Sequence, residues 1–155
     1  MLIRNAEKAD IPTLVALRRA YLQEDLGPLT QAQEAALQAR LPGYFARNLG
    51  SCLHAYLAEA TGQTAAIALL LVSEKPYSPA FPTGLTGTVL NVYTRPSFRR
   101  QGLARAVMQH LLLDAAAWGI CRVDLKATPM GLPLYRALGF TPPGGDYLAL
   151  EKYVK

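Results

Sequence analysis

The chain has 155 residues, of which 51% are apolar and 17% charged, and its formal charge is +5. This composition excludes a disordered chain, and the length predicts a single domain over residues 1–155. No apolar run approaches the roughly 18 to 20 residues of a membrane span, and the first residues lack the pattern of a secretory signal. We therefore expect a cytoplasmic protein that does not bind membranes.

The positive charge alone would suit nucleic acid, a membrane surface or an anionic small ligand. Most basic residues are spread along the chain, but four arginines gather between residues 95 and 105 beside Gly102. This local cluster favours an anion site over a nucleic-acid surface. Cys52 and Cys121 have neither disulfide-framework nor zinc spacing, so we expect reduced thiols and no metal.

The first part of the chain is expected to form a short strand over residues 1–5 and then two helices. Apolar side chains recur at helical spacing between Asp10 and about Glu24. The second helix should run from a capping box at Thr30 toward Asn48, and Pro42 should kink or split it.

The middle of the chain predicts a hairpin of strands 53–60 and 64–72, with the second strand buried on both faces. A proline-containing loop over 75–84 leads to a strand over 85–94. The helix that follows, from about Gly102 to Trp118, is apolar nearly all round, which is typical of a helix packed on a sheet.

The C-terminal part predicts a strand over 121–127, a short helix over 131–138 and a last strand over 146–152. The full order is β-α-α-β-β-β-α-β-α-β. This order indicates an α/β protein of the α+β kind, with a central mixed sheet flanked by helices.

The sequence from the end of strand 85–94 into the long helix predicts an anion site. Helix starts leave about four N–H groups unpaired and carry partial positive charge. Gly102 lets a ligand approach the backbone, and Arg99 and Arg100 add full charges suited to phosphate. The spacings of a P-loop or a dinucleotide-binding fold are absent.

Two motifs at this point resemble a known family, the GCN5-related N-acetyltransferases (GNAT). The stretch Arg99-Arg100-Gln101-Gly102-Leu103-Ala104 is similar to the family's acyl-CoA signature. The stretch Pro133-Leu134-Tyr135-Arg136-Ala137-Leu138-Gly139-Phe140 is similar to its later motif, and the element order also matches. The resemblance implies that acetyl-CoA is the co-substrate.

The resemblance also implies where CoA binds. The loop and helix start would hold the diphosphate, and the strand would pair with the pantetheine arm through its backbone. Some members carry an asparagine before the last helix that contacts this arm; this chain departs from that pattern, and the hydroxyl of Thr128 would take its place. In chain order the implied CoA-binding residues are Asn91, Val92, Tyr93, Thr94, Arg99, Arg100, Gln101, Gly102, Leu103, Ala104 and Thr128.

Tyr135 matches the family tyrosine that donates a proton to the departing CoA thiolate, so the resemblance implies that it is the catalytic residue. Strand 85–94 holds no acidic residue, although many family members carry a glutamate there, so the base stays unassigned. The open alternatives are a water chain or one of Glu24, Asp25, Glu59, Glu74 and His54.

The resemblance places the acceptor near the first two helices and the central hairpin, a region with Tyr21, Glu24, Asp25, Tyr44 and the loop 77–81. We expect an N-acetyltransferase in which an amine attacks acetyl-CoA directly. The alternative is a CoA-binding sensor or structural module without catalysis. The acceptor, the acyl-chain preference and the oligomeric state stay open, a homodimer being common in the family.

Overall fold

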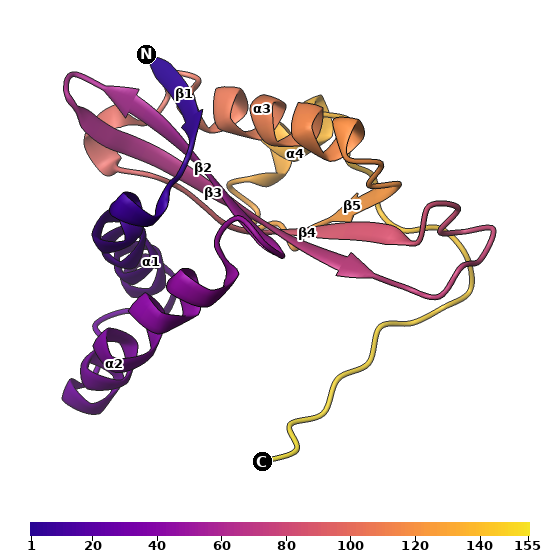
Figure 1. Ribbon diagram of the computed structural model, residues 1–155, viewed down its shortest axis with the longest axis horizontal. Coiled ribbons are helices and arrows are strands. Elements are labelled where there is room, and N and C mark those ends of the chain that lie inside the picture. Colours follow the sequence, from indigo (N-terminus) through magenta and orange to yellow (C-terminus); the bar gives the residue numbers. More distant parts are fainter.

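A five-stranded sheet runs through the computed structural model, which describes residues 1–155. The strands are neighbours in chain order, and every pair is antiparallel except β4 with β5, which is parallel. Figure 1 shows this mixed sheet with helices on both sides, as predicted. The strands are β1 Leu2–Asn5, β2 Leu53–Ala60, β3 Gln63–Glu74, β4 Leu85–Thr94 and β5 Arg122–Asp124.

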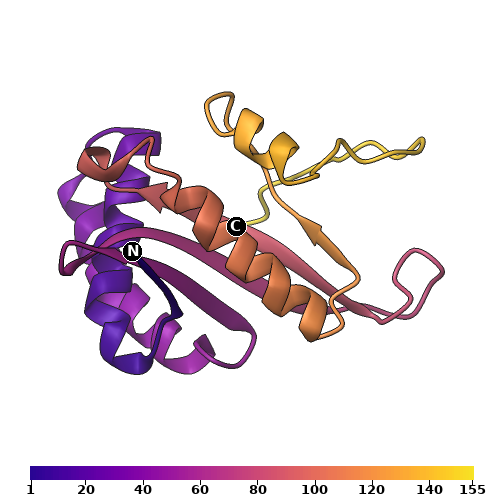
Figure 2. The same ribbon diagram turned by 90° about the horizontal axis from the view of Figure 1, so that it is seen from above.

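Four α-helices cover the two faces of the sheet. They are α1 Ile11–Leu26, α2 Gln31–Asn48, α3 Leu103–Ala117 and α4 Leu132–Ala137, with 3₁₀ turns at Lys8–Asp10 and Pro96–Phe98. Helices α1 and α2 lie on one side of the sheet, and α3 crosses the other side with α4 beside it (Figure 2). None of these helices has the length and apolar character required to cross a membrane.

Strand β3 supplies side chains to both cores, which confirms the prediction that it is buried on both faces. Ala66, Ala68 and Leu70 pack with α3, whereas Ile67 and Leu69 pack with α1 and α2. This alternation is that of a central strand covered on each side by helices.

Helix α2 is one continuous helix, so of the two effects predicted for Pro42, a kink or a split, the split is wrong. Pro42 lies inside the helix, and the buried side chains of Leu37 and Phe45 anchor the turns on either side of it. Tertiary packing of an apolar face stabilises a helix enough to compensate for the one hydrogen bond that proline removes.

Strands β4 and β5 pair over a short distance and then separate. Thr86–Thr88 faces Arg122–Asp124, but β4 continues to Thr94 without a partner on this side. Within the unpartnered stretch, Asn91 has a left-handed φ of 56° opposite a register shift in β3. The strand predicted over 121–127 is therefore shorter in the structure, and β4 keeps an open edge from residue 89 to 94.

The predicted last strand over 146–152 is absent. The five-stranded sheet ends at β5, and the chain from residue 141 onward carries no helix or strand. Pro142 and Pro143 have no N–H to donate to a sheet edge, and the tail leads away from β5 (Figure 1). Alternating apolar residues form a strand only where a neighbouring edge pairs with them, and this segment has no such neighbour.

Candidate functional site

The start of α3 presents a run of backbone N–H groups with no acceptor inside the protein. The amides from Arg100 to Arg105 make no hydrogen bond to backbone or side chain, and the first helical bond of this segment is from Ala106 N to Gly102 O. Arg100 and Gly102 both have left-handed backbone conformations, with φ of 62° and 80°. Consecutive free amides at a helix start form a concave site for an anion such as a phosphate group.

The arginines beside these amides have two different roles in the structure. Arg99 turns toward α1 and β4: its guanidinium pairs with Glu24, its Nε donates to Thr94 O at 2.9 Å, and it lies over the ring of Tyr93. Arg100 is exposed and makes no ion pair. Arg99 therefore braces the loop, and Arg100 is the arginine free to approach an anion.

The open edge of β4 leads toward this anion site. Val92 packs toward α3 and Tyr93 packs toward α1 and α2, so the backbone polar groups between them lie in the plane of the sheet. No residue of β5 or of the following loop hydrogen-bonds to residues 89–94. An extended ligand with amide groups can add to this edge in the way that a further strand would.

Tyr135 lies on α4, with its ring buried and its hydroxyl unengaged. The residue is 8% exposed and its ring packs edge-to-face on Phe140. The hydroxyl makes no hydrogen bond and is not sealed from solvent. Burial, and secondarily the nearby Tyr21 hydroxyl, raise the pKa of Tyr135, so the phenol is a protonated donor at neutral pH. Gly131 permits this packing, because a Cβ there would lie 3.0 Å from the Tyr135 ring.

Thr128 belongs to the turn that starts α4. Its Oγ1 accepts a hydrogen bond from Gly131 N at 3.2 Å, and its carbonyl accepts from Gly131 and Leu132. The hydroxyl keeps its proton available to a ligand, and the residue is exposed.

The side of β4 opposite α3 receives polar side chains from the first two helices. Arg18 Nη1 of α1 donates to Asn91 Oδ1 at 3.2 Å, and its guanidinium lies over the ring of Tyr21. Tyr44 of α2 lies close enough for the Arg18 charge to affect its pKa, which burial raises. Sequence reasoning placed Tyr21 and Tyr44 in this region but missed Arg18, because its contact with Asn91 spans 73 positions.

The acidic residues and the histidine considered as bases are scattered in the structure. Glu59 is held by Arg4 and Thr64 at the far side of the sheet, and His54 packs on Trp118 at the end of α3. Glu24 is paired with Arg99, and Asp25 and Glu74 are exposed at the ends of α1 and β3.

Asp124 is a carboxylate at this site that sequence reasoning missed. It is the last residue of β5, and Thr88 Oγ1 of β4 donates to its Oδ1 at 2.7 Å. This pair marks the point where β4 and β5 separate. An aspartate at the end of a strand has no sequence signature of its own. Only the pairing of β5 with β4, which places Asp124 opposite Thr88, identifies it.

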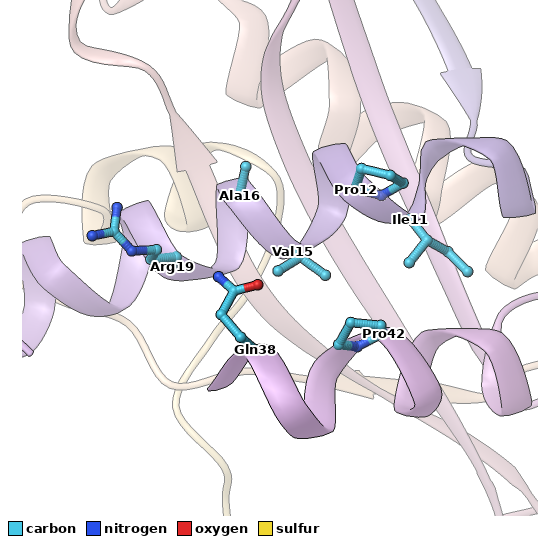
Figure 3. A pocket seen from close by; sticks show the side chains of 7 residues that line it. All are labelled: Ile11, Pro12, Val15, Ala16, Arg19, Gln38 and Pro42. Atoms are coloured by element: carbon cyan, nitrogen blue, oxygen red, sulfur yellow. The ribbon is translucent and has the colours of Figure 1, made fainter. Parts of the chain in front are cut away.

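A hollow between α1 and α2 lies away from these groups (Figure 3). Arg19 and Gln38 supply its polar side chains, and Arg19 is engaged by Glu34. The hollow contains neither the free backbone amides nor the buried tyrosine that the region around the start of α3 and α4 supplies. Its lining residues are Ile11, Pro12, Val15, Ala16, Arg19, Gln38 and Pro42.

Comparison with known protein families gives one matching description, the acetyltransferase (GNAT) domain, over residues 51–142. The matched segment extends from the start of β2 to beyond α4, so it includes the open edge of β4, the start of α3 and Tyr135. A curated relative, the chloroplastic GCN5-related N-acetyltransferase 1 of Arabidopsis thaliana, is 37% identical over 71 residues. That match covers 44% of this chain and only 36% of the relative.

Two solved structures resemble the chain over nearly its whole length. A predicted acetyltransferase from Clostridium acetobutylicum, solved with acetyl-CoA, is 28% identical with a TM-score of 0.79, and the match covers 97% of this chain and 95% of that one. A GCN5-related N-acetyltransferase from Ralstonia eutropha JMP134 is 27% identical with the same TM-score, over 96% and 97% of the two chains.

Proposed function

Because this chain belongs to the GNAT acetyltransferase family, whose members transfer acetyl groups from acyl-CoA, we propose that it moves the acetyl group of acetyl-CoA to an amine by direct attack. The observation that carries the proposal is the row of free amides from Arg100 to Arg105 at the end of the open β4 edge. One segment offers donors to a diphosphate, and the other offers a strand edge to an amide-bearing arm.

In the proposed donor complex, the amides from Arg100 to Ala104 bind the CoA diphosphate, and the backbone from Asn91 to Thr94 pairs with the pantetheine arm. Arg100 adds charge from the exposed side, and Arg99 holds the loop against β4. The Thr128 hydroxyl donates to the arm from the start of α4. The thioester then lies where β4 and β5 separate, within the region that Tyr135 and Asn91 border.

In the proposed reaction, the amine nitrogen forms a bond to the thioester carbon, and the C–S bond then breaks. An alkylammonium with a pKa near 10.4 requires about 4 to 5 kcal/mol to lose its proton at pH 7. Asp124 is the carboxylate placed to receive that proton, directly or through water, at the point where the strands separate.

Tyr135 donates a hydrogen bond to the sulfur as it leaves. A tyrosine of pKa about 10 is a weaker acid than a thiol of about 8.5, which makes full proton transfer uphill by about 2 kcal/mol. Burial of Tyr135 raises its pKa further, so the hydroxyl acts as a donor that strengthens as charge develops on sulfur. No residue forms a covalent acyl intermediate in this mechanism.

Thiol release from acetyl-CoA in the presence of an amine panel tests the proposal, with CoA protection against thermal unfolding measured in parallel. We expect millimolar CoA to raise Tm, because a ligand that binds only the folded protein stabilises it, and we expect thiol release that depends on an amine. Protection without turnover on any amine would indicate a non-catalytic CoA-binding module. Absence of protection would contradict both readings.

A further inference from the structure

Two neighbouring arginines of α1 point to different partners. Arg19 forms a bidentate pair with Glu34 of α2, at 2.8 and 2.9 Å from its Nε. Arg18 instead reaches β4, where Nη1 donates to Asn91 Oδ1 at 3.2 Å. The ion pairs of the structure are made by other arginines, so no carboxylate neutralises Arg18. A guanidinium has five N–H donors, and protein atoms accept from one nitrogen of this group.

Asn91, the partner of Arg18, has an unsatisfied donor. The residue is 4% exposed, and its Nδ2 is the buried side-chain polar atom of the structure without a hydrogen-bond partner. The left-handed backbone at this position turns the amide toward α1, on the side of β4 away from α3. Burying an amide donor without an acceptor is unfavourable, so a ligand oxygen at this position would supply what the protein lacks.

The groups around Arg18 leave its positive charge uncompensated. Tyr21 lies under the guanidinium and carries no carboxylate, and Tyr44 is a half-buried phenol whose pKa is raised mainly by burial, so Tyr44 is neutral at physiological pH. The acidic residue of the neighbouring helix turn, Glu24, is already bound to Arg99. A second cation entering this region would be repelled, whereas an anionic oxygen would be attracted.

We infer that Arg18 binds a carboxylate of the acceptor, with Asn91 Oδ1 orienting the guanidinium and Asn91 Nδ2 donating to the same bound group. The acceptor class is then an aminocarboxylate, a molecule with a primary amine and a carboxylate. This inference rests on the proposed function and names the substrate class of the same site. Arginine suits the assignment because its planar fork matches the two oxygens of a carboxylate.

Matched pairs of amines test this substrate class. The panel contains ω-amino acids with one to five methylene groups between amine and carboxylate, the carboxamide of each, and the polyamine spermidine. An amino acid amide has a less basic amine than its acid and exposes more free nucleophile at neutral pH, so intrinsic reactivity favours the amide. A preference for the acid therefore reports recognition of the carboxylate, and the best chain length reports the distance from that carboxylate to the thioester.

Arg18→Gln removes the charge, Arg18→Lys retains it, and Arg19→Gln is the matched control on the adjacent residue of α1. We expect Arg18→Gln to raise KM for the best aminocarboxylate about 10- to 100-fold with kcat changed less, to leave the KM for its carboxamide nearly unchanged, and to preserve acetyl-CoA affinity. Arg18→Lys should recover part of the loss. Arg19→Gln should keep the wild-type preference for the acid over the amide.

A binding measurement keeps the inference testable if turnover is absent. Calorimetric titration of the CoA-saturated protein with the same acids and amides should show aminocarboxylate binding that Arg18→Gln weakens. Turnover of amides or spermidine in preference to acids, or an acid preference that Arg18→Gln leaves intact, would overturn the inference while the proposed transferase function stands. If the protein neither turns over any amine of the panel nor binds an aminocarboxylate, both this inference and the proposed transfer to an amine are wrong.

Discussion

The proposed donor side and the proposed acceptor side of the site are built from different kinds of groups. The donor side consists of backbone: free amides from Arg100 to Arg105 and the open edge of β4. The acceptor side consists of side chains from α1 and α2, among them Arg18, Tyr21 and Tyr44. The position of backbone groups depends on the fold and not on residue type, so proteins that share the fold can bind the same co-substrate. Side chains differ between family members, so the acceptor can differ as well.

One contact joins the two sides. Glu24 near the end of α1 binds Arg99, which also holds the Thr94 carbonyl and covers Tyr93. The helix that carries Arg18 is thus attached to the loop that carries the anion site. Substitutions on the two sides should nevertheless have separable effects, on the donor and on the acceptor.

Tyr135→Phe should lower kcat about 100-fold without changing the KM for acetyl-CoA, because only the hydrogen bond to the departing sulfur is lost. Since burial raises the pKa of Tyr135, its hydroxyl is protonated at neutral pH, and the loss of kcat in the variant should stay about the same across the neutral pH range. Steady-state kinetics from pH 6 to 10.5 measure both effects.

Tyr56→Phe is the matched control for this change. Tyr56 is also a buried tyrosine, but its hydroxyl donates to Asp114 at 2.9 Å on the α3 side of the sheet. This variant should lose stability and keep kcat. Full activity of Tyr135→Phe across the pH range would remove Tyr135 from the mechanism.

Asp124→Asn should lower kcat/KM at pH 7 by about 10- to 100-fold, because the amine loses its proton acceptor. Asparagine can still accept the Thr88 hydrogen bond, so the contact between β4 and β5 is retained. The loss should shrink as pH approaches the pKa of the amine, where free amine forms without a base. Glu74→Gln, at the exposed end of β3, is the control. Equal loss at pH 7 and pH 10 would contradict the assignment of Asp124 as base.

Gly102→Ala should weaken CoA binding about 10-fold, because the new methyl group would stand where the diphosphate approaches the amides. Gly119→Ala is a close control at the other end of α3. Both glycines have left-handed φ, 80° and 78°, and at both sites an added Cβ would meet no atom within 4 Å. The two variants should lose similar stability, and only Gly102→Ala should lose CoA affinity by calorimetry. Equal CoA affinities would contradict the predicted diphosphate site.

Asp10→Asn should lower the free energy of unfolding by about 0.5 to 1 kcal/mol at pH 7, since Asp10 joins the start of α1 to Arg4 of β1. The hydrogen bond from Arg4 holds the pKa of Asp10 below its usual value of 3.8. Its contribution is therefore complete above about pH 4 and is lost as pH falls through the folded-state pKa. Urea titrations at pH 7 and pH 2.5 should show a difference that is smaller in acid. CoA affinity at pH 7 should not change, because the donor side does not involve this pair.

The sequence predicted the elements around the proposed donor side because their features are local. A strand end, a glycine with a left-handed conformation and a helix start lie within a few residues around Gly102, and each has its own residue preference. The turn between β2 and β3 was equally predictable, since Thr61 and Gly62 adopt the positive φ angles of a tight hairpin.

The acceptor side depends on contacts between distant segments, and sequence reasoning missed most of them. Arg18 meets Asn91 across 73 positions, and Asp124 meets Thr88 across 36. Neither contact follows from a local pattern. The predicted last strand was wrong for the same reason, because alternation over residues 146–152 says nothing about whether an edge is available to pair with it.

The central claim is that backbone groups of β4 and of the start of α3 bind the CoA co-substrate. Amide ¹H–¹⁵N shifts of the assigned protein, recorded during a titration with CoA, test it most directly because they report on the backbone itself. We predict that the largest changes fall on residues 91–94 and 100–105, with small changes along α2. Changes concentrated instead in the hollow between α1 and α2, with the amides from Arg100 to Arg105 unaffected, would contradict the account.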